Sequence, residues 1–249
     1  MTAEAGILIT GAASGIGAAL ARQLAGPGAR LRLHTRRNLE RLEAVAASCR
    51  AKGAQVTCCE GDLAEAGAGA RIVAAATREG GGLAGLVANA GFADRTAFAD
   101  LDPAKLAASF DPIARGFMEL ALAALPHLVD GGRIVAVSSF VAHVFRAGVP
   151  LFAASAVAKA ALEAQVKLLA FELAPRAITV NAVVPGFVRK DQSAHRAMEA
   201  DRWNAIAGQI PLGRIGEPAE IAAAIAFLLS PPAAYITGQF LHVNGGLCI

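Results

Sequence analysis

The sequence has few charges, and this shortage excludes several kinds of protein. Charged residues make up 17% of the 249 residues, and the net charge is only +3. A balance so close to neutral gives no reason to expect a nucleic acid or an anionic membrane as a partner. No apolar run is as long as a membrane span. No basic segment precedes the first apolar run, so we expect neither a signal peptide nor a transit peptide.

Cysteine is also scarce, and no cysteine is spaced like a metal ligand or a redox pair. The four are Cys49, Cys58, Cys59 and Cys248. Cys58 and Cys59 are neighbours on a predicted strand, where adjacent side chains point to opposite faces, so a bridge between them is not expected. We therefore predict reduced thiols, a cytoplasmic protein and no metal site.

The sequence is rich in alanine and glycine, and short apolar runs alternate with longer helical patterns. Apolar residues make up 55% of the chain, which is enough for a large core. The alternation predicts an α/β protein with a doubly wound parallel sheet of about seven strands, in a single domain over residues 1–249. The predicted strands are residues 6–9, 30–34, 55–60, 83–88, 133–138, 178–184 and 240–243. The main predicted helices are residues 38–52, 68–79, 103–128, 152–174 and 218–229.

A glycine-rich loop, residues 10–17, lies between the first predicted strand and a run of good helix formers, residues 18–24. Glycine adopts positive φ angles and lets a ligand approach the backbone closely. The free amides at a helix start, together with the helix dipole, favour an anion. We therefore predict a phosphate cradle, although the spacing Gly-x3-Gly-x-Gly differs from the G-x-G-x-x-G fingerprint. The alternative is a glycine-rich turn that binds nothing.

No acidic residue follows the second predicted strand. That strand ends at His34, and Thr35, Arg36 and Arg37 come next. In a dinucleotide-binding fold a carboxylate here accepts a hydrogen bond from the ribose 2′-OH, whereas arginine accommodates a 2′-phosphate. A guanidinium binds phosphate with two parallel hydrogen bonds. We therefore predict NADP(H) in preference to NAD(H), and the alternative is an ordinary solvated basic turn.

In their order and spacing, several short motifs resemble the short-chain dehydrogenase/reductase family over nearly the whole chain. Besides the glycine loop, they are residues 61–63, 89–91, 132–139, 159–162, 181–186, 211–216 and 236–239. The resemblance implies a Rossmann-type fold and hydride transfer between nicotinamide and a carbonyl, alcohol or enoyl substrate. It also implies a homodimer or homotetramer and a substrate lid at about residues 187–212. The cofactor contacts that it implies come from Gly11, Ala13, Ser14, Gly15, Ile16, Gly17, Thr35, Arg36, Arg37, Asp62, Leu63, Asn89, Ala90, Gly91, Lys159, Pro185, Gly186 and Val188.

The catalytic set that this resemblance implies is only partly present. The family uses a serine, a tyrosine with a lysine four residues later, and an asparagine that holds a relay water. Ser139 and Lys159 match the serine and the lysine. The asparagine position is Ile113, and the usual tyrosine position is Ser155.

A second register resembles the enoyl-acyl-carrier-protein reductases of the same superfamily, in which the tyrosine precedes the lysine by seven residues. Seven residues is nearly two helical turns, so this spacing also places a group on the lysine's face of the helix. The residue there is Phe152, which has no hydroxyl and cannot donate a proton. The only tyrosine, Tyr235, lies in a turn that the resemblance places far from the site.

Three side chains are candidates to replace the missing acid. Ser139 could bind the substrate oxygen while solvent supplies the proton. Ser155 lies one turn before Lys159 and could orient a water, although a hydrogen bond to the backbone is its favoured role. His143 lies in the loop expected near the substrate and titrates near neutral pH. Two functions stay open: an NADP(H)-dependent oxidoreductase with a degenerate acid site, and a cofactor-binding protein without turnover that has a regulatory or assembly role.

Overall fold

The computed structural model of the protein describes residues 5–78, 80–189 and 200–249. In these ranges seven strands run parallel in one sheet, in the order β3-β2-β1-β4-β5-β6-β7. The strands are β1 (Gly6–Ile9), β2 (Arg30–Thr35), β3 (Gln55–Glu60), β4 (Leu83–Ala88), β5 (Leu128–Val137), β6 (Thr179–Pro185) and β7 (Phe240–Val243). The chain reverses its direction of travel across the sheet between β1 and β4, which is where ligands bind in such folds. The predicted doubly wound, Rossmann-type α/β fold is confirmed.

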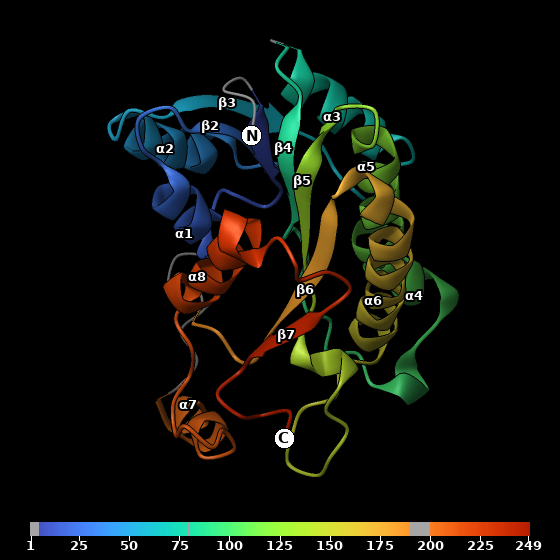
Figure 1. The fold of residues 1–249 in the computed structure, drawn as a ribbon. Coiled ribbons are helices and arrows are strands. Elements are labelled where there is room, and N and C mark those ends of the chain that lie inside the picture. The colour runs from blue at the N-terminus through green and yellow to red at the C-terminus, as the bar shows by residue number, and fades with distance from the viewer. Residues whose placement is uncertain (1–4, 79, 190–199) are drawn as a thin grey trace.

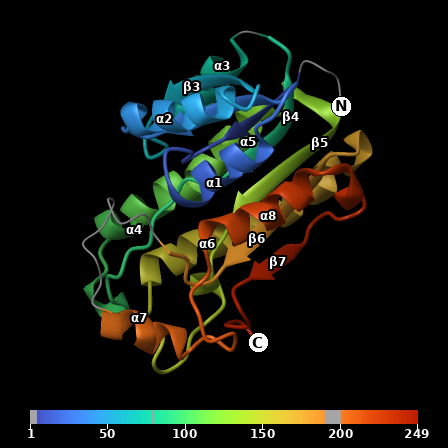
Figure 2. The same ribbon diagram turned by 90° about the vertical axis from the view of Figure 1, so that its left-hand side faces the viewer.

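Helices cover both faces of the sheet (Figures 1 and 2). On one face lie α1 (Gly15–Leu24), α2 (Leu39–Arg50) and α8 (Pro218–Leu229). On the other lie α3 (Ala68–Thr77), α4 (Pro103–Phe110), α5 (Gly116–Ala124) and α6 (Ala153–Leu173). A short helix, α7 (Ala200–Ala207), lies beyond the end of β7 in Figure 1.

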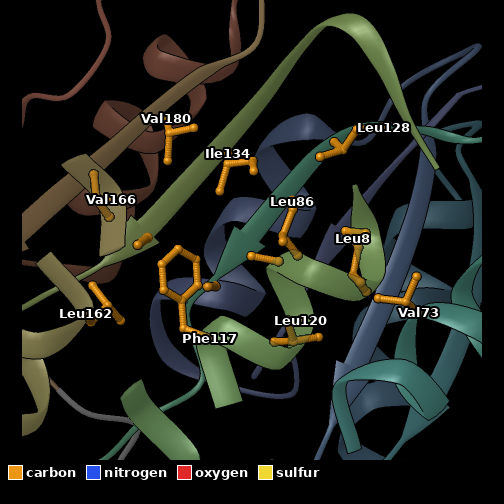
Figure 3. Packing of buried hydrophobic residues seen from close by; sticks show 14 of the residues in the cluster. Leu8, Val73, Leu86, Phe117, Leu120, Leu128, Ile134, Leu162, Val166 and Val180 are labelled. Carbon is orange, nitrogen blue, oxygen red and sulfur yellow. The ribbon is translucent and has the colours of Figure 1, made fainter. Parts of the chain in front are cut away.

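Each face of the sheet has its own buried core, because the central strands are apolar on both sides. The core beneath α3, α5 and α6 is drawn in Figure 3 and includes Leu8, Leu86, Phe117, Leu120, Ile134 and Leu162. The core beneath α1, α2 and α8 includes Ile9, Leu20, Leu33, Leu42 and Ile225. Burying one such side chain contributes about 1.5–3 kcal/mol. The two cores together hold the strand ends in fixed positions.

Most predicted element boundaries hold within one or two residues, but the predicted helix 103–128 is wrong. Two helices, α4 and α5, occupy that segment, and a π-helical turn, Asp111–Arg115, lies between them. Pro112 has no backbone N–H to donate, which disfavours a regular α-helix at that point. The last residues of the segment differ too, because β5 begins at Leu128 rather than at Arg133.

The cysteines are free thiols, as predicted. Burial, together with the nearby Glu43 carboxylate, raises the pKa of Cys58 to about 12. Burial also raises the pKa of Cys59 to about 11. Neither thiol is a nucleophile at neutral pH, because the thiolate is the reactive form. Within the described part of the chain, no helix is long and apolar enough to cross a membrane.

Candidate functional site

The glycine loop turns from the end of β1 into α1, which begins at Gly15 rather than at Ala18 as predicted. Gly11 and Gly15 have positive φ angles of 66° and 54°, a conformation that favours glycine. Among the described residues, no atom lies within 4 Å of the place where a Cβ of Gly15 would stand. Ser14 precedes the helix in extended conformation, and its side chain caps no helix amide. A glycine loop that leads directly into a helix start is the kind of place at which backbone N–H groups bind an anion.

Asn89, at the end of β4, fixes the glycine loop from the neighbouring strand. Its Nδ2 donates to the carbonyl oxygens of Thr10 and Gly11 at 2.9 and 3.2 Å. The Thr10 hydroxyl accepts the backbone N–H groups of Asn89 and Ala90, each at 3.0 Å. A Cβ added at Gly17 would lie 2.5 Å from the Gly11 oxygen and 2.7 Å from Asn89 Nδ2, so no side chain fits there. The turns after β1 and β4 therefore form one tightly packed unit.

A pocket of about 320 Å³ lies at the ends of β2 and β3. It is lined by Arg36, Arg37, Glu60, Gly61, Asp62, Glu65 and Arg71. Arg36 and Arg37 are exposed, and a guanidinium nitrogen of Arg37 lies 3.8 Å from an Asp62 oxygen. An exposed ion pair at this distance is weak, so a phosphate can compete for the guanidinium. The other Asp62 oxygen accepts the backbone N–H of Ala64 at 3.0 Å.

His34 is buried beside this pocket and forms hydrogen bonds with the glycine loop and with the loop after β3. Its Nε2 donates to the Gly61 carbonyl oxygen at 2.9 Å, and its own carbonyl accepts the backbone N–H of Ala12 at 2.9 Å. Burial lowers the pKa of His34, although the Gly61 carbonyl and Asp62 oppose the shift. The neutral ring thus ties the end of β2 to the loop after β3. Thr35, the next residue, is buried and accepts the backbone N–H of Gly61 at 3.1 Å.

Lys159 reaches from α6 to the ends of β4 and β5. Its Nζ donates to the Val137 carbonyl oxygen at 2.6 Å. A Cβ added at Gly91 would lie 3.4 Å from the same nitrogen. Burial lowers the pKa of Lys159 to about 8, although the Glu163 carboxylate opposes the shift. The ammonium therefore lies beside the turn after β4, at the same edge of the sheet as the glycine loop.

Ser139 and Phe152 border an aromatic cluster. The Ser139 hydroxyl accepts the backbone N–H of Val141 at 3.4 Å, at the start of a short 3-10 turn. The rings of Phe140 and Phe152 meet edge to face, with their centroids 6.1 Å apart. The Phe187 ring lies 4.5 Å from that of Phe140. Where the resemblance implies a phenol, the chain therefore has a buried apolar ring.

Ser155 is buried on the first turns of α6, and its hydroxyl accepts the backbone N–H of Asp94 at 2.9 Å. The predicted hydrogen bond to the backbone is present, but the partner is the loop after β4 rather than the helix itself. Ile113, at the position of the family's asparagine, is buried in the π-helical turn. Its side chain has no polar atom with which to hold a relay water.

A polar cluster that the sequence analysis missed lies on the α6 side of the strand ends. Glu163, one turn after Lys159, accepts hydrogen bonds from the Ser138 hydroxyl and from His143 Nε2, the latter at 2.8 Å. The ring of His242 on β7 meets that of His143 edge to face at 4.8 Å between centroids. Burial lowers the pKa of His242. His143, a candidate acid, is thus bound to Glu163, and the four-residue spacing between Lys159 and Glu163 is the signal that could have found the cluster.

The remaining predicted cofactor residues lie at the same edge of the sheet or pack beneath it. Pro185 ends β6, and a Cβ added at Gly186 would lie 2.9 Å from the Cβ of Asn244. Val188 pairs with Gly216 in an isolated parallel bridge. Ala13 and Ile16 pack against the core beneath α1, α2 and α8. Leu63 is buried in the core beneath α3, α5 and α6.

The predicted lid at residues 187–212 includes residues 190–199, which lie outside the described residues. Its described part includes α7. Among the residues that the structure describes, no group of three or more His, Cys, Asp or Glu side chains is arranged to hold a metal ion.

Comparison with known sequences gives matches over nearly the whole chain. The model of a family described as enoyl-(acyl carrier protein) reductase matches residues 11–248. An uncharacterized oxidoreductase of Methylorubrum extorquens is 34% identical over 241 residues, which cover 96% of each chain. The 3-oxoacyl-[acyl-carrier-protein] reductase of Vibrio cholerae is 36% identical over 243 residues, again 96% of each chain.

Solved structures also match this fold over nearly the whole chain. A short-chain dehydrogenase/reductase from Serratia marcescens has a TM-score of 0.90 and 33% identity, covering 98% of each chain. A short-chain dehydrogenase from Burkholderia cenocepacia, solved in complex with NADP, has a TM-score of 0.89 and 32% identity. That match covers 99% of this chain and 98% of the other.

Proposed function

Because the chain belongs to the short-chain dehydrogenase/reductase family, we propose that it is an NADP(H)-dependent oxidoreductase acting on the carbonyl, alcohol or enoyl group of a small molecule. One observation carries the proposal: the positive-φ glycine loop that leads into α1 and the buried ammonium of Lys159 lie at one edge of the sheet, at the ends of its central strands. The bound nicotinamide supplies or accepts the hydride.

Three groups of residues would hold the dinucleotide. The backbone amides at the start of α1 bind the pyrophosphate. Lys159 donates to the hydroxyls of the nicotinamide ribose, and the exposed guanidiniums of Arg36 and Arg37 bind a 2′-phosphate. The NADP complex of the relative from Burkholderia cenocepacia supports this choice of cofactor.

Of the family's side chains that polarise the substrate oxygen, the chain retains the serine, Ser139. Negative charge develops on that oxygen as hydride adds to carbon, and the Ser139 hydroxyl donates to it. Phe152 has no proton to give, so water supplies it. Loss of one such donor costs about 3 kcal/mol of barrier, which slows turnover on the order of a hundred-fold. An enoyl substrate tolerates the loss better than a ketone, because its enolate needs stabilisation more than immediate protonation.

A second candidate is a cofactor-binding protein without turnover, in a regulatory or assembly role. The observation that favours it is the apolar character of two positions at which the family has polar side chains. Phe152 and Ile113 are both buried and neither can transfer a proton. This candidate shares the whole cofactor site with the first.

Cofactor titration tests both candidates. We expect the purified protein to quench and shift NADPH fluorescence on binding, with a lower Kd for NADPH than for NADH. The double variant R36Q/R37Q weakens NADPH binding about ten-fold, because two charge-assisted contacts are lost, and leaves NADH binding unchanged. Binding of neither nucleotide at millimolar concentration would overturn both candidates, whereas equal affinities would overturn only the preference for NADP(H).

Restoring the phenol separates the two candidates. We expect Phe152→Tyr to raise kcat about a hundred-fold with at least one member of a panel of ketones and enoyl thioesters, because it returns a general acid to the site. Phe145→Tyr, on an exposed residue of the preceding loop, is the matched control and leaves kcat unchanged. Absence of turnover in both the parent and F152Y, with NADPH bound, would favour the protein without turnover.

We further propose that residues 1–249 act as one cofactor-binding domain, with a substrate lid at about residues 187–212. The protein assembles as a homodimer or homotetramer in the cytoplasm. Its free cysteines support a reducing compartment. Large apolar side chains on the outer faces of α5 and α6 support assembly.

A further inference from the structure

Arg95, in the loop after β4, carries a positive charge directly over the ring of Phe152. Its Cζ lies 6.0 Å from the ring centroid. The face of an aromatic ring attracts a guanidinium at this distance. None of the ion pairs formed among the described residues includes Arg95. The charge is therefore not neutralised by a carboxylate and lies next to the position that lacks its phenol.

The loop that bears Arg95 is fixed to α6 on one side and by its own turn on the other. The backbone N–H of Asp94 donates to the Ser155 hydroxyl at 2.9 Å. The Asp94 carboxylate accepts the backbone N–H of Thr96 at 2.6 Å. Arg95 stands between these two anchored residues. Ser155 thus holds the backbone of this loop against α6, one helical turn before Lys159.

Arg95 is exposed to solvent, and the ring beneath it is buried. The Phe152 ring meets the ring of Phe140, which directly follows Ser139 in the sequence. The buried rings of Phe140 and Phe152 shield one side of the guanidinium from water, and an electrostatic interaction is stronger where water is scarce. A guanidinium offers five N–H donors and keeps its proton at every physiological pH. It can stabilise an oxyanion as a phenol does, but it cannot supply the proton.

We propose that Arg95 is a further catalytic residue, which donates with Ser139 to the substrate oxygen in place of the missing phenol; this inference rests on the proposed function. Hydride adds to the electrophilic carbon, and the π-electron pair moves through the carbonyl or the conjugated enoyl system to oxygen. Arg95 stabilises the resulting alkoxide or enolate. Water then protonates the alkoxide oxygen or the enolate α-carbon and leaves hydroxide, which solvent neutralises. The site thus favours substrates whose oxygen adjoins an apolar chain.

Binding of a charged and a neutral analogue tests the proposal without turnover. In the presence of NADP+, decanoate places a negative oxygen where the oxyanion forms, and decanamide is its neutral counterpart. By calorimetry we expect Arg95→Gln to weaken decanoate binding about ten-fold and to leave decanamide binding within two-fold. Arg95→Lys retains part of the preference. Arg78→Gln, exposed at the far end of α3, is the control and changes neither. Unchanged decanoate affinity in R95Q, or no preference for decanoate in the parent protein, would overturn the proposal.

Kinetics supply a second readout. With the best substrate of the panel, R95Q lowers kcat at least ten-fold and leaves the KM for NADPH unchanged. Adding F152Y to R95Q restores turnover, because either group can serve the same oxygen. Ser155→Ala, which frees the loop, gives a smaller loss of kcat. An R95Q enzyme with the parent's kcat would contradict the proposal. NADPH titration of the parent protein and of R95Q distinguishes this result from failure of the proposed function. If the proposed function is wrong, the parent does not bind NADPH; if only the role of Arg95 is wrong, both proteins bind it.

Discussion

The buried ammonium of Lys159 lowers the free energy of unfolding of the protein at neutral pH. Burial lowers its pKa from an ordinary value of 10.5 to about 8. At neutral pH the ammonium is charged in both the folded and the unfolded chain, but only the folded chain holds it away from water. Between about pH 8 and 10.5 the unfolded chain binds more protons, so stability rises with pH across that window.

Replacing this lysine should separate stability from binding. We expect Lys159→Met to raise the free energy of unfolding at pH 7 by about 1–2 kcal/mol, because the buried charge is removed and the apolar stem remains. The same change removes the ribose contact, so NADPH binding falls below detection. Urea denaturation and fluorescence titration measure the two effects. Lys167→Met, exposed on the same helix with its ammonium 5.1 Å from the centroid of the Phe240 ring, is the control, and we expect it to lower the free energy of unfolding by at most about 1 kcal/mol. A destabilised K159M would show that the hydrogen bond to Val137 outweighs the burial of charge.

Because the His34 ring is buried, the free energy of unfolding depends on pH in the mildly acidic range. Its pKa is lowered by burial in the folded chain, so below about pH 6.5 the unfolded chain takes up a proton first. Stability is therefore fully present above that pH and falls as pH drops toward the folded pKa, by at most about 1.4 kcal/mol per pH unit. We expect His34→Gln to flatten this slope in urea denaturation at pH 7.5, 6 and 5. His127→Gln, at an exposed histidine, keeps the parent's slope; a slope that survives in H34Q would refute the assignment.

At the level of elements, the packing of α3 on α5 depends on one glycine. A Cβ at Gly69 would lie 2.5 Å from the backbone carbon of Glu119 and 2.6 Å from the nitrogen of Leu120. Alanine normally favours a helix over glycine by about 1 kcal/mol. Here we expect Gly69→Ala to destabilise the protein by about 2–3 kcal/mol, because the two helices must move apart. Gly26→Ala, where a Cβ meets nothing within 4 Å, should be neutral in the same urea experiment. Equal midpoints for the two variants would contradict this account.

Local spacing predicted the elements but not the contacts between distant loops. The strands and the glycine loop are readable because burial on both faces of a sheet leaves apolar runs between turn residues. The π-helical turn is not readable, because it depends on tertiary partners: Gln165 on α6 donates to the Ala114 carbonyl at 3.0 Å. The placement of Arg95 depends on Ser155, which joins segments that are far apart in the sequence. Such pairs are settled by the packing of α6 against the sheet.

At the scale of the whole molecule, the outer faces of α5 and α6 carry large exposed apolar side chains. Both helices lie on the outside of the fold (Figure 1), where Met118, Leu122, Leu168 and Phe171 are exposed. Phe171 has 85% of its surface in contact with solvent and Leu168 has 63%. Contiguous apolar surface of this kind marks an interface. A two-fold axis across it would cover the same residues on both copies.

Light scattering coupled to size-exclusion chromatography can test this surface. We expect the parent protein to have the mass of two or four chains, and Phe171→Glu to halve that mass at least, because the interface would bury a charge without a partner. Leu39→Glu, which adds the same charge at the start of α2 on the opposite face of the sheet, leaves the mass unchanged. NADPH binding should survive in F171E, since its site lies at the strand ends rather than on the outer face of α6. A monomeric parent, or an F171E variant with the parent's mass, would mean that these apolar side chains do not hold the copies together.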